Sequence, residues 1–229
     1  MKKQILLVLI IISSLQTFAQ PKSGVFCIGI MGMGKNTWLF NKNVNDQPLG
    51  EQELQLSFGT NLGATMSFYF NDNVGIGLDI LYGTHNQKYN GVTDNIIKTP
   101  YTSKFHLSSL DMPLYLRLST NGGAYFEFGS VFSVITGATY SRETADLSEK
   151  SNEKSNTSGF NIAPMFGMGI DVNVNDRIII NPGLRLSYGL SDIKGVDGKG
   201  NNIAGYSDYQ KTHTLAAGLM VGVVYRVGN

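Results

Sequence analysis

The sequence predicts an all-β fold: an eight-stranded antiparallel up-and-down transmembrane β-barrel with short periplasmic turns and long external loops. Three observations predict it. Apolar and polar residues alternate along eight segments, short and long connections alternate between those segments, and the charged residues within the segments fall on the polar face. The length of 229 residues suits one such domain.

The alternation is clearest in residues 54–70. Leu56 and Phe58 belong to a mostly apolar face, and Asn61 and Gly63 belong to the opposite face of small or polar residues. A period of two is typical of a strand whose two faces meet different surroundings, and no helix produces it. The same pattern predicts eight strands, over residues 25–34, 54–70, 74–84, 105–119, 124–137, 160–174, 178–190 and 212–227.

The connections between the predicted strands alternate strictly between short and long. The short ones are residues 71–73, 120–123 and 175–177, and they contain the Asn, Asp and Gly residues that tight hairpins favour. All the long connections therefore lie at one end of the sheet. This arrangement is typical of outer-membrane barrels, and an even number of strands returns both termini to the periplasmic side.

The charged residues inside the predicted strands indicate which face meets lipid. When each strand is phased by its apolar residues, all of these charges fall on the polar face, which we expect to line a narrow lumen. An arginine that faces lipid at mid-membrane costs about 2–4 kcal/mol, so a membrane barrel should show this arrangement. The predicted lumen charges are Asp79, Asp111, Arg117, Glu127, Asp171, Arg185 and Arg226.

Outward aromatic residues cluster near the ends of the predicted strands. Such clusters are typical of the aromatic girdles that mark the two interfaces of a membrane. The residues expected at the periplasmic interface are Phe68, Phe70, Phe126 and Tyr225. Those expected at the external interface are Phe58, Tyr82, Phe160 and Tyr188.

A soluble, lipocalin-like ligand-binding barrel is the alternative fold, because its strands also alternate. Such a barrel carries lysine and glutamate on its outer face, whereas every lysine here lies outside the predicted strands. The membrane barrel is therefore favoured. Pro113, Pro164 and Pro182 lie inside strands of a sheet that has no edges, and we expect β-bulges there.

The first residues predict export from the cytoplasm. Lys2 and Lys3 precede the apolar run 5–12, and small residues lead to Ala19, as in a secretory signal peptide. We therefore expect a signal peptide over residues 1–19 and a barrel domain over residues 20–229, located in the outer membrane. The balance of 18 Lys and Arg against 17 Asp and Glu argues against binding to nucleic acid.

Four stretches carry a resemblance to a known family. They are the signal ending in Ala19-Gln20, SSLDMPLYLRL at 108–118, GIDVNVNDRIIINPGLRLSYGLSDI at 169–193 and VGVVYRV at 221–227. With these motifs the chain resembles the PorT-like outer-membrane β-barrel family of Bacteroidetes. The founding member of that family serves protein secretion. The resemblance implies outer-membrane lipid and the barrel-assembly machinery as partners, and envelope or secretion-system proteins as further candidates.

The lumen charges are the first candidate for chemistry. Four acidic residues and three arginines in a narrow lumen form either a paired structural plug or a path and gate for ions or protons. Arg117 and Glu127 flank a short turn on the same face, so we expect them to pair. The plug is the favoured interpretation, and a narrow conducting channel is the alternative.

The three histidines are the second candidate. His85, His106 and His213 all lie near the predicted external rim, and His85 and His106 could share a metal ion from neighbouring strands. Ser108, Ser109 and Asp111 lie near His106, as a rim enzyme would need. The spacing supports neither site strongly, and we expect no metal, no cofactor and no enzymatic activity.

The long loops are the third candidate. Residues 141–159 and 195–202 are polar, and Asp197 with Asn201 only partly matches a calcium loop. Trp38, Leu39 and Phe40 place apolar bulk in an expected external loop or on the rim at the lipid interface. Cys27 is expected to pack inside the lumen. The sequence thus predicts a non-enzymatic outer-membrane barrel that acts through its external loops or through envelope partners.

Overall fold

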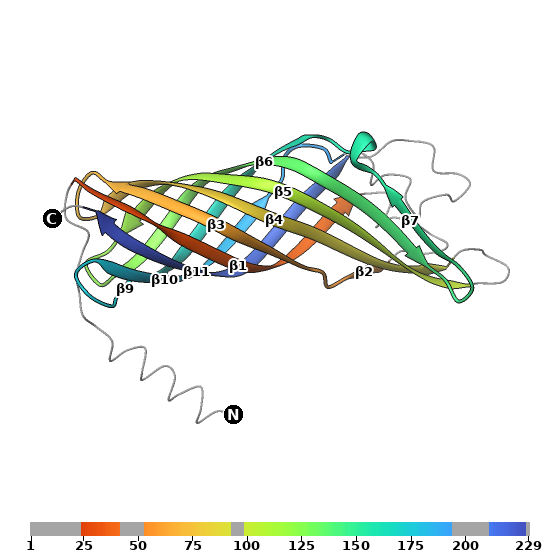
Figure 1. Ribbon diagram of the computed structural model, residues 1–229, viewed down its shortest axis with the longest axis horizontal. Helices are drawn as coiled ribbons and strands as arrows, with labels where there is room; N and C mark the ends of the chain where they lie inside the picture. Colours follow the sequence, from red (N-terminus) through yellow and green to blue (C-terminus); the bar gives the residue numbers. More distant parts are fainter. Residues whose placement is uncertain (1–23, 42–52, 93–98, 194–210, 228–229) are drawn as a thin grey trace, which may run out of the picture.

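The structure, a computed structural model, describes residues 24–41, 53–92, 99–193 and 211–227. Its main feature is a closed ring of eight antiparallel strands, in which β11 pairs with both β1 and β10 (Figure 1). Around the ring the strands are β1 (Val25–Asn41), β3 (Phe58–Tyr69), β4 (Val74–Val92), β5 (Pro100–Ser119), β6 (Ala124–Glu143), β8 (Phe160–Ile170), β10 (Ile178–Tyr188) and β11 (Thr212–Val227). The predicted eight-stranded up-and-down barrel is confirmed.

Four minor elements complete the described chain. At one end β2 (Glu53–Gln55) pairs with β4 and β7 (Ser148–Asn152) pairs with β6, followed by the short 3₁₀ helix η1 (Lys154–Asn156). At the other end β9 (Val172–Asn173) pairs with β10. The predicted signal peptide, residues 1–19, lies outside the described residues.

The short turns are held by side chains of their own asparagines. Asn71 Oδ1 accepts hydrogen bonds from the backbone of Asn73 and Val74, and Asn175 Oδ1 accepts them from Arg177 and Ile178. This side-chain mimic of a backbone turn explains why asparagine opens both connections. The third turn instead uses Gly123, whose φ of +78° only glycine adopts without strain.

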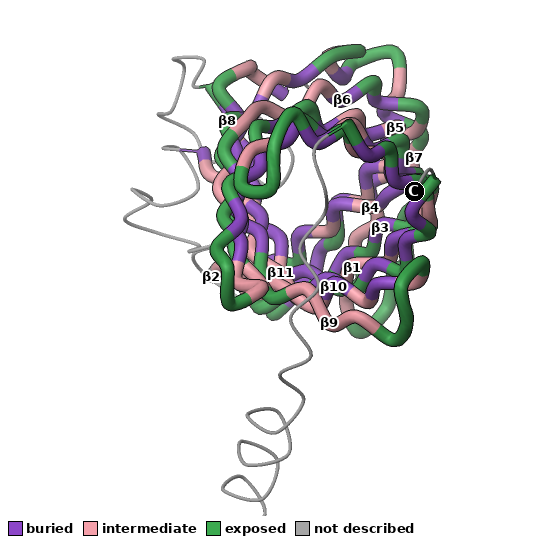
Figure 2. Tube along the Cα trace, turned by 90° about the vertical axis from the view of Figure 1, so that its left-hand side faces the viewer, coloured by how far each residue is buried: buried purple, intermediate pink, exposed green. Residues whose placement is uncertain are grey.

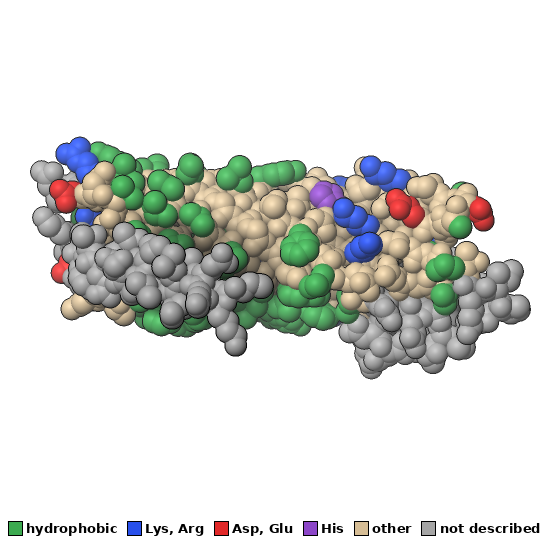
Figure 3. Space-filling view, turned by 90° about the horizontal axis from the view of Figure 1, so that it is seen from below, with side chains coloured by type: hydrophobic (Ala, Val, Ile, Leu, Met, Phe, Trp, Pro, Cys, Tyr) green, Lys and Arg blue, Asp and Glu red, His purple; other side chains and the backbone are tan. Residues whose placement is uncertain are grey.

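The burial pattern alternates along each strand, with buried residues on the inner side of the tube and exposed residues on the outer side (Figure 2). In β5 the outward residues from Leu110 to Leu118 are all apolar, while Asp111 and Arg117 face inward. We define the membrane-spanning part of the barrel by this outward apolar band. Hydrophobic side chains cover the same part of the surface in Figure 3, and charged side chains gather towards the ends.

Beyond the apolar band, at the end opposite the termini, the two faces exchange their character. The outward residues of β5 become polar, as at Lys104 and His106, whereas the inward residues include Phe105 and Leu107. These inward residues belong to an apolar cluster that crosses the interior, formed by Leu39, Phe105, Leu107, Ile135, Ala138, Tyr140 and Ile193. We call it the external apolar plug. The barrel therefore has a charged lumen within the membrane and, above it, an interior in which this apolar cluster packs beside buried polar residues such as Gln87 and Ser103.

This exchange makes several strands longer than predicted. β1, β4, β5 and β6 all extend into connections that were expected to be long loops, and β7 lies within the expected loop 141–159. The predicted strand ends were wrong because they were placed where the outward apolar residues stop. The expectation that every lysine lies outside the strands is likewise wrong for Lys35, Lys88 and Lys104 in the ring, and for Lys150 in β7.

The longer β1 also corrects the expected external loop at residues 38–40. Trp38, Leu39 and Phe40 are strand residues, and Leu39 is fully buried in the external apolar plug. Cys27 is buried at the periplasmic end of the lumen among Val25, Tyr69, Ile179 and Val224. The possible calcium pair Asp197 and Asn201 lies outside the described residues.

The strand prolines are accommodated without the bulges that were expected. Pro113 and Pro182 keep the register of their strands, but pairs are missing beside each of them in one of the two ladders. A missing N–H interrupts only the ladder towards which it would point, because alternate residues of a strand bond to opposite neighbours. The register shift between β5 and β6 falls at Ser108 and Ser109, where Thr136 is the extra residue.

The apolar band gives a first prediction. Replacing Leu114, which is outward and within the band, by Arg should destabilise the barrel by about 2–4 kcal/mol, because the charge would meet hydrocarbon. Thr102→Arg, outward on the same strand but beyond the band, should change stability by less than about 0.5 kcal/mol. Urea unfolding of the purified protein in lipid vesicles measures both. Equal effects would contradict the assigned membrane boundary.

Candidate functional site

Five charged side chains form one network in the membrane-spanning part of the lumen. Arg185 on β10 donates from Nε to Glu127 Oε2 on β6 at 2.8 Å, and from Nη1 to Asp79 Oδ2 on β4 at 2.6 Å. Arg117 on β5 lies 3.3 Å from the other oxygen of Glu127 and also pairs with Asp171. Each guanidinium therefore binds two carboxylates, and Glu127 is shared between the two arginines.

Neutral groups complete the network around Asp79. Thr65 Oγ1 and Tyr115 Oη donate to Asp79 Oδ1 at 2.6 and 3.1 Å. The guanidinium of Arg185 lies 4.8 Å from the centre of the Tyr115 ring, and that of Arg117 lies 3.6 Å from the Tyr125 ring. Cation–π contacts of this kind are strengthened where water is excluded.

The strand order shows that this network links opposite sides of the barrel. β4 and β10 lie on opposite sides of the eight-stranded ring, so the ion pair between Arg185 and Asp79 crosses the lumen. Both carboxylates that bind Arg185, Asp79 and Glu127, are fully buried. Buried ions are tolerated only when paired and hydrogen-bonded, so the network is a cross-brace whose loss leaves stranded charges.

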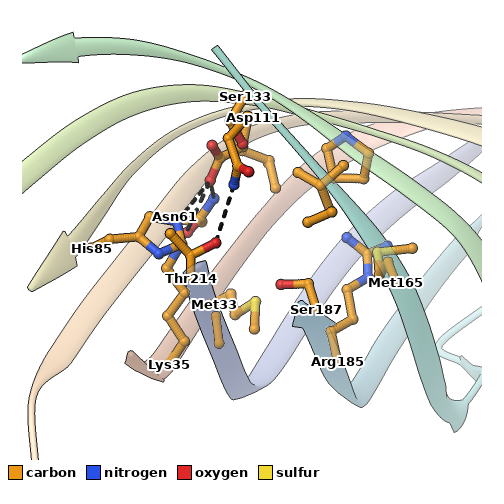
Figure 4. A pocket seen from close by; sticks show the side chains of 16 residues that line it. Met33, Lys35, Asn61, His85, Asp111, Ser133, Met165, Arg185, Ser187 and Thr214 are labelled. Atoms are coloured by element: carbon orange, nitrogen blue, oxygen red, sulfur yellow. Dashed lines mark hydrogen bonds and ion pairs between the residues drawn. The ribbon is translucent and has the colours of Figure 1, made fainter. Parts of the chain in front are cut away.

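A second, smaller cluster lies towards the external end of the lumen. Lys35 Nζ on β1 lies 2.9 Å from His85 Nε2 on β4 and 3.6 Å from Asp111 Oδ2 on β5 (Figure 4). Asn61 Nδ2 donates to the same Asp111 oxygen at 2.7 Å. The four side chains come from four adjacent strands and meet because each occupies an inward position of its strand.

A cavity of about 40 Å³ separates the two clusters and is lined by residues of both, together with apolar side chains such as Met33 and Val131. Arg185 stands on one side of it, and Lys35, Asn61, His85 and Asp111 stand on the other (Figure 4). Several buried atoms that border it have no protein hydrogen-bond partner among the described residues: Asn61 Oδ1, His85 Nδ1, Asp111 Oδ1, Asn161 Oδ1 and Arg185 Nη2. A space of this size admits about three water molecules, which could hydrogen-bond with these atoms.

The structure brings together some of the predicted lumen charges and separates others. Asp79, Arg117, Glu127, Asp171 and Arg185 form the first network, and the expected contact between Arg117 and Glu127 is present. Asp111 belongs to the second cluster. Arg226 is apart from both, at the periplasmic end, where its Nη1 donates to the backbone carbonyl of Asp176 at 3.0 Å.

Sequence analysis missed Lys35 and His85 as lumen residues. Lys35 is nearly fully buried and balances the lumen charge, giving four cations and four anions where the predicted set had three and four. The period of two contained the signal: Lys35 continues the inward phase of Cys27 and Met31, and His85 continues that of Asp79. This signal was overlooked because the outward residues beside Lys35 and His85 are not apolar, so the strands were predicted to end before them.

The histidines do not form the metal site that their spacing suggested. His85 faces the lumen and His106 faces outward, on neighbouring strands, so they cannot share one ion. His213 contacts the Gly189 carbonyl oxygen at 3.0 Å. Within the described ranges, no three His, Cys, Asp or Glu side chains are grouped so as to hold a metal ion.

The rim set of His106, Ser108, Ser109 and Asp111 is divided between the two faces. Ser109 and Asp111 are buried in the lumen, while His106 and Ser108 lie on the outer wall. The predicted girdle residues are all outward and exposed: Phe58, Phe68, Phe70, Tyr82, Phe126, Phe160, Tyr188 and Tyr225.

These features are those of an integral outer-membrane β-barrel with a braced lumen. The chain belongs to the family described as outer membrane protein beta-barrel domain, whose sequence profile matches residues 20–195. The barrel and the family together place the protein in the outer membrane. None of the curated proteins compared with the chain matches it. In the described part of the chain, no helix is both long enough and apolar enough to cross a membrane.

Three solved structures illustrate the similarity. OprG from Pseudomonas aeruginosa is 14% identical, with a TM-score of 0.48 and coverage of 92% of this chain and 99% of that one. The outer membrane protein AlkL in lipid bilayers is 12% identical, with a TM-score of 0.49 and coverage of 92% and 93%. Outer membrane protein W of E. coli is 12% identical, with a TM-score of 0.42 and coverage of 90% and 99%. We draw no functional conclusion from these similarities.

The cross-brace gives a second prediction. Arg185→Met should destabilise the barrel by about 3–5 kcal/mol, because it leaves Asp79 and Glu127 buried without this partner. Arg226→Met removes the same charge from a site that makes no ion pair among the described residues, and should cost about 1–2 kcal/mol. Urea midpoints of both variants in vesicles test the contrast. A smaller loss for Arg185→Met than for Arg226→Met would contradict the bracing role.

Proposed function

We propose that this protein is a closed outer-membrane barrel whose lumen neither conducts nor catalyses, and which acts by presenting its external end to other envelope components. The observation that carries the proposal is the ion pair from Arg185 to Asp79 across the lumen, with its further bond to Glu127. A path for hydrated ions through this level would require breaking that brace.

The external apolar plug supports the same proposal. It draws residues from β1, β5 and β6, and Leu39, Phe105 and Leu107 within it have no exposed surface. An apolar cluster at this level opposes the passage of ions, because an ion that enters it loses part of its hydration shell. The small cavity lies on the other side of it, between Arg185 of the brace and the cluster of Lys35, His85 and Asp111.

The external end offers a surface for a partner. There β4, β5 and β6 continue beyond the apolar band, and β2 and β7 widen the sheet that they form (Figure 1). Leu147, in the turn between β6 and β7, is 57% exposed and lies well outside the apolar band. A single exposed apolar side chain is ordinary on a protein surface, so Leu147 serves here as an accessible position for a crosslinking probe.

The finer features of the proposal are an N-terminal signal peptide, membership of the PorT-like group, an origin in Bacteroidetes and a role beside the secretion machinery. They rest on the resemblance of the sequence motifs. A narrow ion- or proton-conducting channel is the competing function, favoured by the charged groups and the cavity in the lumen. The two functions differ in conductance.

Planar-bilayer recording tests the closed lumen. The purified protein should show no discrete conductance steps, and Glu127→Gln should leave the trace unchanged while lowering stability by about 1–3 kcal/mol, because both arginines lose a charged partner. Ion-selective steps in the wild type that change in Glu127→Gln would establish the channel instead.

Crosslinking in intact cells tests the external contact surface. A photoreactive residue at Leu147 should capture a discrete envelope protein, whereas the same residue at Leu219, which is 69% exposed on the outward face of β11, should capture none. Equal capture at both positions would contradict a specific surface at the external end.

A further inference from the structure

One side-chain cluster on the outer wall lies outside both lumen networks. Ser108 Oγ lies 3.3 Å from His106 Nε2, two residues away on β5. The other nitrogen of the same imidazole, His106 Nδ1, lies 2.5 Å from Asn86 Oδ1 on β4. Asn86 and His106 are directly paired across the two strands, so all three side chains share the outward face.

The hydrogen bonds of Asn86 determine the direction of this chain. Asn86 Nδ2 donates to the backbone carbonyl oxygen of Phe58 at 2.5 Å, so the amide oxygen is the atom that faces the imidazole. An amide oxygen can only accept, so the proton of neutral His106 lies on Nδ1. His106 Nε2 is then an acceptor, and Ser108 Oγ–H is its donor. The resulting order, hydroxyl to imidazole to amide, is that of a serine nucleophile with its base and an orienting group.

The location of the cluster is also specific. Ser108 is the first outward residue of β5 beyond Leu110, where the outer face changes from apolar to polar. Opposite it, the register of β6 shifts by one residue, and bulges of this kind re-aim side chains and are common beside active sites. The facing residue is Gly137, on which a Cβ would lie 3.7 Å from Ser108 Oγ. Glycine therefore leaves the hydroxyl open to approach from that side.

The charge around His106 suits a general base. Partial burial, and then the positive charges of Lys104 and Lys150, lower the pKa of His106 below its usual value. The imidazole is therefore neutral at pH 7 and able to take a proton. The same two lysines suit substrates with anionic headgroups.

We propose that Ser108, His106 and Asn86 form the catalytic site of a lipid acyl-ester hydrolase on the outer wall of the barrel. Ser108 and His106 are the catalytic residues, and Asn86 is a positioning residue. The substrate class follows from the location, since the acyl esters of membrane lipids lie where hydrocarbon meets the headgroups. This function goes beyond the proposed binding role of the external end and departs from the expectation of a non-enzymatic barrel.

The reaction is balanced with water as the only co-reactant. Ser108 Oγ forms a bond to the ester carbonyl carbon while its proton moves to His106 Nε2. The bond from that carbon to the alcohol oxygen breaks, and His106 returns the proton to the leaving alcohol. Water then attacks the acyl-serine ester, gives a proton to His106, and releases the fatty acid as the proton returns to Ser108.

The first test uses the purified full-length barrel in vesicles that contain a phospholipid with a labelled acyl chain. The wild type should release labelled fatty acid, and Ser108→Ala should lower the rate at least about a hundredfold. Ser109→Ala is the matched control, because the adjacent serine points into the lumen and its loss should leave the rate unchanged. The heat-dependent mobility of each variant on gels reports its folding independently of activity.

A fluorophosphonate probe followed by mass spectrometry should modify Ser108 in the wild type and leave Ser109 unmodified. Asn86→Asp should retain hydrolysis but move its pH profile upwards, because a carboxylate beside Nδ1 stabilises the protonated imidazole, whereas Asn86→Ala should lower the rate without such a shift. The absence of adduct at Ser108, or lipid hydrolysis that persists in Ser108→Ala, would overturn the proposal. Hydrolysis of a short soluble ester without release from vesicles would overturn its assignment to lipid.

Discussion

The bonds of Arg185 to Asp79 and Glu127 are the constraint on which the barrel interior depends. Eight strands enclose a space that side chains must fill, and the outward face is committed to hydrocarbon, so every charge in the membrane-spanning part has to find its partner inside. Arg185 meets this requirement across the full width of the ring. Because Glu127 is shared with Arg117, the brace extends to Asp171. The charges of four strands and of the β8–β9 connection therefore become interdependent. Because these charges are paired with one another, an opening of the lumen would have to break several ion pairs together.

The second organising feature is the exchange of polar and apolar faces at the external membrane boundary. Within the membrane the solvent outside is hydrocarbon, so the strands are apolar outward and polar inward. Beyond it the solvent is water, and the same strands carry Lys88 and Lys104 outward and Phe105 inward. The same continuous sheet is therefore apolar outward, as in a membrane barrel, within the apolar band. Beyond the band it is polar outward, as in a soluble barrel. The proposed lipid hydrolase site lies at the exchange itself, where a hydroxyl, an imidazole and an amide can be near both water and lipid.

Sequence analysis could predict the ring of strands and the inward phase of Asp79 and Arg185, because period and charge follow directly from the lipid environment. It could not place the strand ends, because its criterion was outward apolarity, which stops at the membrane while the hydrogen-bonded sheet continues. That one error moved Lys35 from the lumen to a loop and His85 from the interior to the rim. The prolines show a different limit: an interrupted ladder and a bulge are alternative answers to a missing N–H, and only the three-dimensional register distinguishes them. The order of donors and acceptors from Ser108 to Asn86 likewise depends on the Phe58 carbonyl, which no local pattern links to them.

The balance of charge explains why function is assigned to the outside of this barrel. With Lys35 included, the predicted lumen residues comprise four cations and four anions, so the interior has no net charge with which to attract an ion of either sign. The waters that its cavity can hold would lie between the two clusters and could bond with the buried polar atoms that have no protein partner there. Charges that are paired with one another in this way contribute to stability and little to recognition. The residues that remain available for chemistry are those that face outward beyond the apolar band, where Lys104, His106 and Ser108 stand on a rigid strand rather than on a loop.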